Sequence, residues 1–210
     1  MKSNILCSIH LYWAYQIFKK TKTLEIRKSK PVCPATVYLY ISKNSYKDLE
    51  KIPKEDRDMC KNWIGKVALK FTLNQVDIIE ICDPDILLNG QQKSWNWFKN
   101  KSCLDAEQLM SYIGYGNDHD GWCMEYDNGY AWHIDNLKIY DKPKELSEFR
   151  KDLDCDDYPC NKNCDCRYNY YDHSEGCWAC GIDFDGANCI YKQIKRPPQS
   201  WCYVEEMKDE

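Results

Sequence analysis

The sequence predicts an α+β fold that is mainly β, a small antiparallel β-barrel with flanking helices. Several segments rich in β-branched and aromatic residues alternate between apolar and polar positions, as strands half-buried in a sheet do. Few segments show helical spacing, and long polar loops separate the strands. A barrel is favoured over an open sheet because closure removes the exposed strand edges.

The expected elements follow from this patterning in chain order. The apolar run at residues 5–9 suits a first strand, and apolar residues then recur at helical spacing through residues 10–20. Residues 44–62 are polar and are expected to be irregular or helical. Residues 64–81 alternate over such a length that they form either one long bent strand or two consecutive strands. Further strands are expected at 35–42, 130–140 and 199–205, and a short helix at 105–112.

Size and composition are those of one globular domain spanning residues 1–210. The hydrophobic content of 43% includes 8 Trp, 16 Tyr and 5 Phe, which is enough to fill a core. No stretch reaches the roughly 18–20 uncharged apolar residues that a membrane span requires. Polar residues interrupt the apolar run near the start and no small-residue cleavage site follows, so we expect mature structure there. These features predict a cytoplasmic protein with no membrane partner.

The net charge of −4 argues against a protein that binds duplex nucleic acid nonspecifically. The charge is unevenly distributed along the chain. Residues 1–30 hold seven cations and one anion, whereas residues 152–196 hold five cations and nine acids. An anionic ligand is therefore expected to bind the N-terminal part of the chain.

Several motifs, in order along the chain, resemble those of ASCH domains, members of the PUA-like superfamily. In the run SIHLYWAYQIFKKTKTLEIRKSKP, the residues Lys22, Glu25 and Arg27 take the charged positions of the family's K-x-x-E-x-R signature. The further matches are VYLYISK (37–43), GKVALKF (65–71), GYAWHIDNLKIYDKPKELSEF (129–149) and RPPQSWCYVEE (196–206). The last two of these are most similar to ASCH proteins of bacteriophages and Gram-positive bacteria.

The resemblance implies a β-barrel with a cleft between the barrel and its first helix. Related domains bind RNA, DNA or modified bases there, and some small ASCH proteins are ribonucleases or hydrolases of acetylated cytidine. In those hydrolases the motif resembles K-T-x-T-x-R, with the second threonine as nucleophile. This chain keeps Lys22, Thr23 and Arg27 but has Glu25 at the nucleophile position. The departure counts against that activity, because a carboxylate can act as a base but cannot replace that nucleophile.

The residues after the first helix form a candidate binding site on physical grounds. In an extended chain Thr23, Glu25 and Arg27 share one face, so Glu25 can brace the Arg27 guanidinium towards a phosphate or a base edge. Lys22 adds a point charge suited to phosphate. The alternative is that Glu25 and Arg27 form a structural salt bridge and that the neighbouring aromatic rings are core. Rings for base stacking and further donors are expected from Trp13, Tyr40, Trp132, Ser42 and Lys43.

The 14 cysteines divide into two groups. Seven are scattered singly and are expected mostly as buried thiols, because an intracellular chain seldom carries a disulfide framework. The other seven cluster in residues 152–196, where two close pairs flank a ten-residue loop, a spacing that suits a tetrahedral zinc site. The predicted zinc ligands are Cys164, Cys166, Cys177 and Cys180, with a second set available from Cys155, Cys160, Cys189 and His173.

The cysteine-rich segment is expected to be a zinc-binding insert within the domain. It has few aliphatic residues, so it cannot bury enough apolar surface to fold without a metal. The alternatives are reduced thiols in a loose loop or, in an oxidising compartment, disulfides. Structural zinc is the cofactor that the sequence favours.

The sequence as a whole favours a noncatalytic module that binds a nucleotide, a modified base or a single-stranded nucleic acid such as RNA next to the K-x-x-E-x-R motif. One alternative is a hydrolase of modified nucleosides or RNA, an amidohydrolase or a ribonuclease, with Lys22, Glu25 and Thr23 as catalytic residues. Another is a phage-encoded protein that binds a host protein in the host cytoplasm. Its contact surface would be the aromatic residues at 94–98 or the zinc-binding insert.

Overall fold

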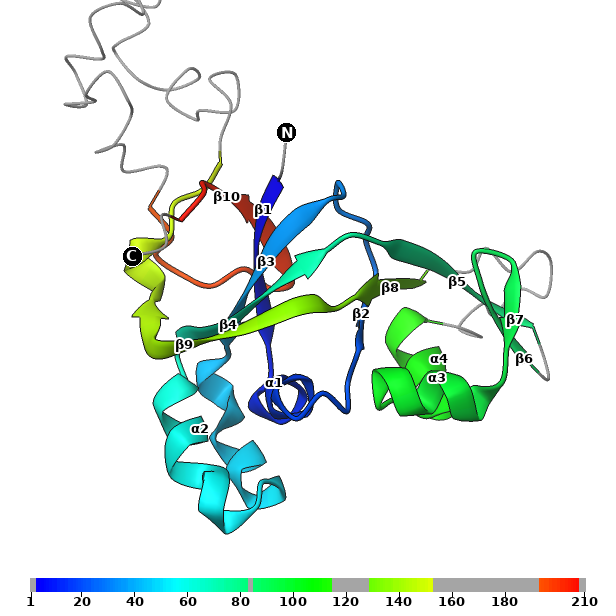
Figure 1. The fold of residues 1–210 in the computed structure, drawn as a ribbon, viewed down its shortest axis with the longest axis horizontal. Helices are drawn as coiled ribbons and strands as arrows, with labels where there is room; N and C mark the ends of the chain where they lie inside the picture. The colour runs from blue at the N-terminus through cyan, green and yellow to red at the C-terminus, as the bar shows by residue number, and fades with distance from the viewer. Residues whose placement is uncertain (1–2, 83–84, 115–128, 153–192, 208–210) are drawn as a thin grey trace, which may run out of the picture.

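The structure is a computed structural model that describes residues 3–82, 85–114, 129–152 and 193–207. It is mainly β with several helices, and its strands form two five-stranded sheets (Figure 1). All eight predicted zinc ligands lie outside the described residues. Within these residues, no helix is both long and apolar enough to cross a membrane, and no three His, Cys, Asp or Glu side chains gather to hold a metal ion.

The first sheet carries the main core. In it β1 and β3 are parallel, joined by a crossover through helix α1 (Leu11–Phe18), and the other neighbouring strands are antiparallel. The helix buries Leu11, Ala14 and Ile17 against one face of the sheet. In spatial order the strands are β10 (Trp201–Val204), β1 (Ser3–Ile9), β3 (Ala35–Ile41), β4 (Lys66–Leu73) and β9 (Asp135–Glu145).

Side chains of β3 alternate between the two faces of this sheet. Val37 and Leu39 join the core beneath α1. Tyr38 and Tyr40 pack on the opposite face together with Phe149, whose ring lies 5.2 Å from that of Tyr38. The alternation follows from the two-residue period of a strand and places Tyr40 away from α1.

The second sheet is antiparallel throughout and has a core of its own. Ile26, Ile79 and Ala131 pack there against Phe98 and Leu109 of two short helices, α3 (Trp95–Ser102) and α4 (Ala106–Ile113). In spatial order the strands are β2 (Leu24–Arg27), β8 (Gly129–His133), β5 (Val76–Cys82), β6 (Asp85–Leu88) and β7 (Gln91–Lys93).

Two segments of the chain pass from one sheet into the other and join them: β4 is followed by β5, and β8 by β9. Their strands pair antiparallel in both sheets, β4 with β9 and β5 with β8. Two residues separate β4 from β5, and Ile134 alone separates β8 from β9. The register passes from Thr72↔Asp135 in the first sheet to Val76↔Trp132 in the second. Residues 64–81 therefore contain two consecutive strands, which confirms one of the two alternatives, whereas the single strand expected at 130–140 is interrupted.

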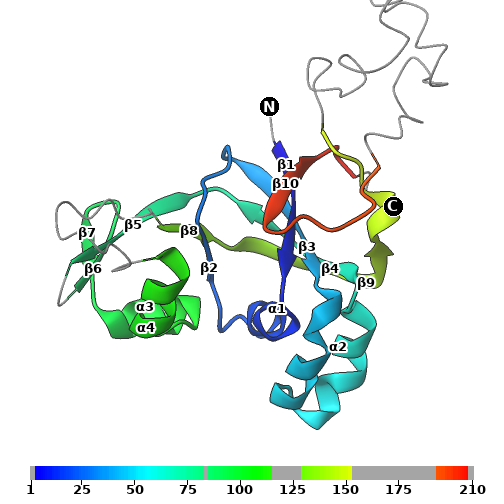
Figure 2. The same ribbon diagram turned by 180° about the vertical axis from the view of Figure 1, so that it is seen from behind.

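A seam without backbone pairing separates β2 from β1 and β10, which lie beside it (Figure 2). Within the described residues, side chains link the two sheets there: Arg27 Nη2 donates to the Ser8 carbonyl oxygen at 2.8 Å, and Trp201 Nε1 donates to Ser29 Oγ at 2.9 Å. The strand pairing described here does not close into one ring, so the barrel stays a prediction.

Helices occupy much of the remaining described chain. The polar residues 44–62 are helical, which confirms one of the two alternatives, and the helix expected at 105–112 is α4, whose Asp105 and Gln108 form a capping box. The 3₁₀ helix η3 (Leu146–Glu148) follows β9. Residues 44–62 fold as the 3₁₀ helices η1 (Lys43–Lys51) and η2 (Lys54–Asp56) and the helix α2 (Arg57–Trp63).

The hairpin β6–β7 and helix α3 were not expected from the sequence. The hairpin turns at Asn89 and Gly90, whose φ angles are 48° and 75°. Positive φ at both central residues is the geometry of a type I′ turn, for which Asn-Gly is the favoured pair. The Asn-Gly dipeptide was therefore a readable signal for this hairpin, although the flanking strands are too short to show alternation.

Candidate functional site

The turn after α1 brings Lys22 into the protein interior. Lys20 adopts a left-handed φ of 59°, and the N–H groups of Thr21 and Lys22 both donate to the Gln16 carbonyl oxygen, at 3.0 and 3.1 Å. Such a helix end satisfies the last carbonyl groups and reverses the chain sharply. The chain then enters β2, where Glu25 pairs with Trp132 of β8. Lys22 and Glu25 thus lie at the start of a buried strand.

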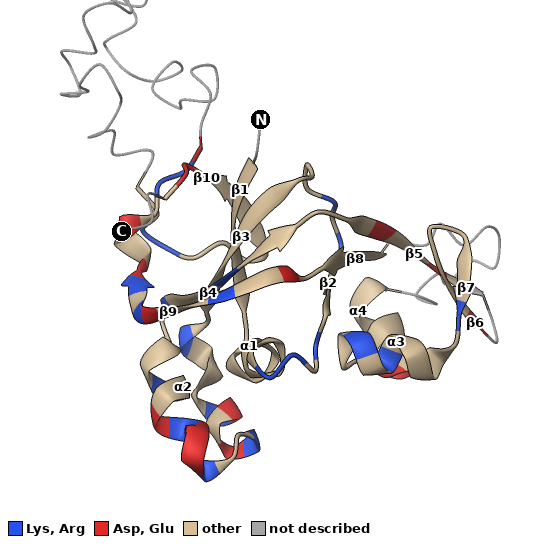
Figure 3. Ribbon diagram, viewed as in Figure 1, with Lys and Arg blue, Asp and Glu red and all other residues tan. Residues whose placement is uncertain are grey.

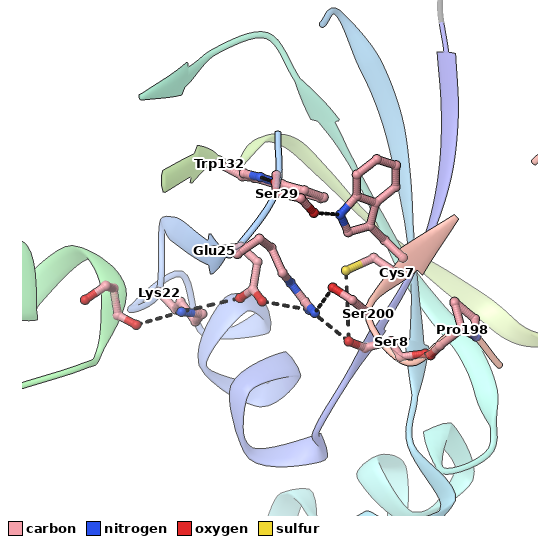
Figure 4. A network of polar contacts seen from close by, with 11 residues as sticks. Cys7, Ser8, Lys22, Glu25, Ser29, Trp132, Pro198 and Ser200 are labelled. Carbon is pink, nitrogen blue, oxygen red and sulfur yellow. Dashed lines mark hydrogen bonds and ion pairs between the residues drawn. The ribbon is translucent and has the colours of Figure 1, made fainter. Parts of the chain in front are cut away.

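Lys22, Glu25 and Arg27 form a buried ion-pair network (Figure 4). Lys22 Nζ lies 3.4 Å from Glu25 Oε2, and Arg27 Nη2 lies 2.8 Å from Glu25 Oε1. The three residues are only 3%, 6% and 7% exposed. Each oxygen of the carboxylate therefore has its own cation, and the network carries a net charge of +1. The ion pair between Glu25 and Arg27 fits both the bracing expected of a binding site and the structural salt bridge that is its alternative.

Lys22 is held by two further neighbours. Its Nζ donates to the Ser102 carbonyl oxygen at the end of α3, at 2.7 Å, and lies 5.4 Å from the centroid of the Trp13 ring. Burial lowers the pKa of Lys22, and the negative charge of Glu25 opposes that effect. Lys22 thus links α1, β2 and α3.

Arg27 is held across the seam between the sheets. Besides Glu25 it contacts the Ser8 carbonyl oxygen and, at 3.4 Å, Ser200 Oγ. Burial acts to lower the pKa of Arg27, but the nearby acidic groups of Cys7 and Glu25 outweigh it and raise the pKa above its ordinary value. Within the described residues, its Nε is buried and has no hydrogen-bond partner. Arg27 therefore keeps one donor unused in an otherwise paired site.

A cavity of about 770 Å³ opens beside this network. Its walls combine the three charged residues with rings from two helices, Trp13 of α1 and the 39% exposed Tyr112 of α4. The chain between α1 and β2 and the helix α3 carry several basic residues (Figure 3). The cavity is lined by Ser8, Ile9, His10, Trp13, Lys22, Glu25, Ile26, Arg27, Lys28, Leu104, Gln108, Ser111, Tyr112, Gln199 and Ser200.

The structure divides the predicted ligand-binding residues among three places. Trp13, Lys22, Glu25 and Arg27 line the cavity just described. Trp132 is fully buried, and its Nε1 donates to the Ser29 carbonyl oxygen at 3.3 Å, so it offers no free face to a base. Tyr40, Ser42 and Lys43 line a second cavity, and Thr23 lines neither of the two.

Sequence reasoning missed the contributions of α4 and of the segment before β10. Gln108, Ser111 and Tyr112 lie on α4, and Gln199 and Ser200 precede β10. Nothing in their local sequence marks them as site residues, because tertiary packing alone brings them to β2. The motif RPPQSWCYVEE belongs to the family resemblance, but its sequence does not indicate that Gln199 and Ser200 lie at the site.

The geometry suits binding better than catalysis. Both oxygens of Glu25 are occupied by cations, so Glu25 is poorly placed to act as a general base. His10 lines the cavity, but its Nδ1 lies 3.6 Å from Asp48, and His133 lies 2.7 Å from Asp77 outside the cavity lining. In the described part of the chain, no cysteine or serine is paired with either histidine.

We expect Cys7, which lies beneath the site on β1, to resist alkylation in the folded protein. It is fully buried, and burial raises the pKa of its thiol to about 12. Because the thiolate is the reactive form, the ionised fraction near pH 8 is about a thousandfold smaller than for a thiol of ordinary pKa. Iodoacetamide labelling read by peptide mass spectrometry tests this, with the partly exposed Cys33 as comparison. Equal labelling rates would contradict it.

Comparison by sequence finds no match: no family model and no curated protein matches the chain. Among solved structures, the chain is similar to an ASCH protein from Zymomonas mobilis, at 13% sequence identity and a TM-score of 0.42, over 97% of this chain and 89% of that one. Two substituted forms of the Zymomonas protein give TM-scores of 0.43 and 0.44 at 13% identity. These two alignments cover 98% of this chain and 92% and 90% of the other chains.

Proposed function

We propose that the protein is a noncatalytic module that binds a nucleotide or a single-stranded nucleic acid in the cavity beside Lys22, Glu25 and Arg27. One observation carries the proposal: a buried ion-pair network with a surplus positive charge forms the wall of a 770 Å³ cavity instead of being sealed in the core. An anionic ligand would neutralise that surplus.

The aromatic walls favour a base as the second part of the ligand. Trp13 and Tyr112 line the cavity, and an aromatic ring that stacks on a base contributes about 1–3 kcal/mol. The base edge would find donors and acceptors in Gln108 and Ser111 on α4. A phosphate near Arg27 would contact the charged wall of the cavity, and a base near Tyr112 would contact its aromatic wall.

The proposal also includes three predictions made from the sequence: the barrel, the zinc-binding insert and the phage origin. The motifs resembling ASCH domains support a PUA-like barrel spanning residues 1–210, and the cysteine spacing supports a zinc-binding insert at 152–196. The motifs at 129–149 and 196–206 favour a phage-encoded protein that acts in the host cytoplasm. Catalysis by Lys22, Thr23 and Glu25 receives less support, because Thr23 does not line the cavity and Glu25 is paired on both oxygens.

Substitution of Arg27 and Tyr112 tests the proposed site. We expect Arg27→Lys to weaken binding of a labelled oligouridylate more than tenfold, because lysine cannot reproduce the forked contacts of the guanidinium. Tyr112→Ala removes a partly exposed ring, and the lost stacking corresponds to about a 5- to 150-fold weaker affinity. Fluorescence anisotropy titration measures both effects.

The matched control is Arg57→Lys. Arg57 also donates to backbone carbonyl oxygens, those of Ile52 and Glu50, but it lies on α2 and outside the cavity lining. Its replacement should leave the affinity unchanged. Thermal unfolding of each variant shows whether it is folded. If folded Tyr112→Ala and Arg27→Lys both bind as the wild type does, or if the wild type binds neither nucleotides nor single strands, the proposed site is wrong.

A further inference from the structure

A second cavity, of about 1050 Å³, lies where the ends of β3 and β9 approach the segment before β10. Its walls include Tyr40, Ser42 and Lys43 after β3, and Lys195 and Arg196 before β10. It shares no lining residue with the cavity beside Arg27. Three of the predicted ligand-binding residues that the first cavity lacks, Tyr40, Ser42 and Lys43, thus lie in this one.

The second cavity has surplus positive charge. Two of its lining acids are paired with lysines: Glu145 with Lys66 at 3.0 Å, and Glu148 with Lys144 at 3.6 Å. By contrast, Lys43, Lys195 and Arg196 make no ion pair within the described residues. The cavity therefore suits an anionic ligand.

Gly65 leaves room for the Lys43 side chain. A Cβ atom at Gly65 would lie 3.1 Å from Lys43 Cε and 3.2 Å from Lys43 Cγ, closer than ordinary van der Waals contact. Gly65 also has a φ of 83°, which side-chain-bearing residues rarely adopt. The stem of Lys43 can lie over the backbone because this position is glycine, and a side chain here would crowd it.

The two cavities lie side by side along one stretch of chain. The Ser42 N–H donates to the carbonyl oxygen of Ile9, at 2.9 Å, and these residues line the second and the first cavity respectively. Residues 193–197 line the second cavity, and Gln199 and Ser200 line the first. Between them, Ser8 Oγ donates to the Pro198 carbonyl oxygen at 2.6 Å and fixes the segment (Figure 4).

We propose that the ligand is a single strand of more than one nucleotide, which places one nucleotide in the first cavity, with its phosphate towards Arg27 and its base towards Tyr112, and passes Pro198 so that neighbouring phosphates lie against Lys43 and Arg196. This inference rests on the proposed function and adds a second contact region to it. It predicts that affinity depends on strand length, because a mononucleotide can occupy the first cavity alone.

A length series with charge variants tests the inference. We expect affinity to rise from uridine monophosphate through oligouridylates of increasing length and then to level off. The double variant Lys43→Gln/Arg196→Gln should bind the longest oligomer about 25-fold more weakly at 0.1 M salt, because each phosphate contact on a single strand adds a salt slope of about 0.7. Its affinity for uridine monophosphate should equal that of the wild type.

Two further variants test the position of Lys43 and the effect of removing charge elsewhere on the surface. Gly65→Ala, which displaces Lys43 without altering any charge, should weaken oligomer binding alone. Lys54→Gln/Lys61→Gln, at exposed positions on η2 and α2, should change nothing. If mononucleotide and oligomer bind equally and Lys43→Gln/Arg196→Gln has no effect, the second contact region is wrong while the first site stands. If oligomer binding depends on Lys43 but not on Arg27 or Tyr112, the proposed function of the first cavity is wrong instead.

Discussion

Replacing Glu25 by glutamine is expected to lower the free energy of unfolding by about 3–5 kcal/mol, because it leaves two buried cations without their shared anion. Lys22 Nζ and Arg27 Nη2 lie 3.4 and 2.8 Å from the Glu25 carboxylate, and all three side chains are more than nine-tenths buried. Glutamine has nearly the same shape, so the change isolates the charge. Urea denaturation measures the loss.

The pH dependence of this variant gives a second readout. Burial lowers the pKa of Lys22, and Glu25 opposes that effect, so Glu25→Gln should lower this pKa further. A lysine whose pKa is lower in the folded state favours folding in its neutral form. The stability deficit should therefore be largest at pH values below the lowered pKa and should shrink as the pH approaches 10.5, the ordinary value.

Lys66→Gln serves as the control for the buried network. Its ion pair with Glu145 is exposed, with 40% and 58% of the two side chains accessible, and such pairs contribute about 0–1 kcal/mol. A loss of stability in Glu25→Gln no larger than that in Lys66→Gln would show that the buried network does not depend on Glu25.

Added phosphate should stabilise Glu25→Gln more than the wild type, because the net charge of the network rises from +1 to +2.

The second large effect is expected at Trp132, where replacement by alanine should cost about 3–5 kcal/mol. Trp132 is fully buried and pairs with Glu25 of β2 on one side and Val76 of β5 on the other. Its ring lies 5.8 Å from that of Trp201, whose strand belongs to the first sheet. Its removal leaves a large void where the two sheets meet.

Thermal and urea unfolding measure this loss, with Trp97→Ala as the control. Trp97 lies on α3, is only partly buried and contacts Lys93 at 5.4 Å, a cation–π contact worth about 0.5–1 kcal/mol at exposed sites. Trp132→Ala should lose at least twice as much stability as Trp97→Ala. Equal losses would contradict a central role of Trp132 in joining the sheets.

Much of the fold was predictable where local patterning decides it. The strands β1, β3, β4 and β5 and the helices α1 and α4 follow from apolar spacing, and the pairing of Glu25 with Arg27 follows from the extended chain at β2. Helix α3 was not predicted, because Trp95, Trp97 and Phe98 stand close together and do not show a helical repeat. The division into two sheets depends on strand register, which local sequence does not specify.

The candidate site was predictable only in part, for two physical reasons. Tyr40 was assigned to the cleft beside α1, although the alternation of β3 places Val37 and Leu39 on that side and Tyr40 on the other. That error was avoidable from the sequence. The contributions of Tyr112 and Ser200 were not, because these residues reach Arg27 through packing between segments far apart in the chain.

We expect the molecule to open first along the seam beside β2. Within the described residues it is bridged by a few side chains, among them Arg27 to Ser8 and Trp201 to Ser29, whereas every other strand boundary inside the sheets carries a backbone ladder. Thermal fluctuations can therefore part the fold along this line while both sheets stay intact. Such opening would widen the cavity beside Arg27 and let a bulky ligand enter while both sheets remain folded.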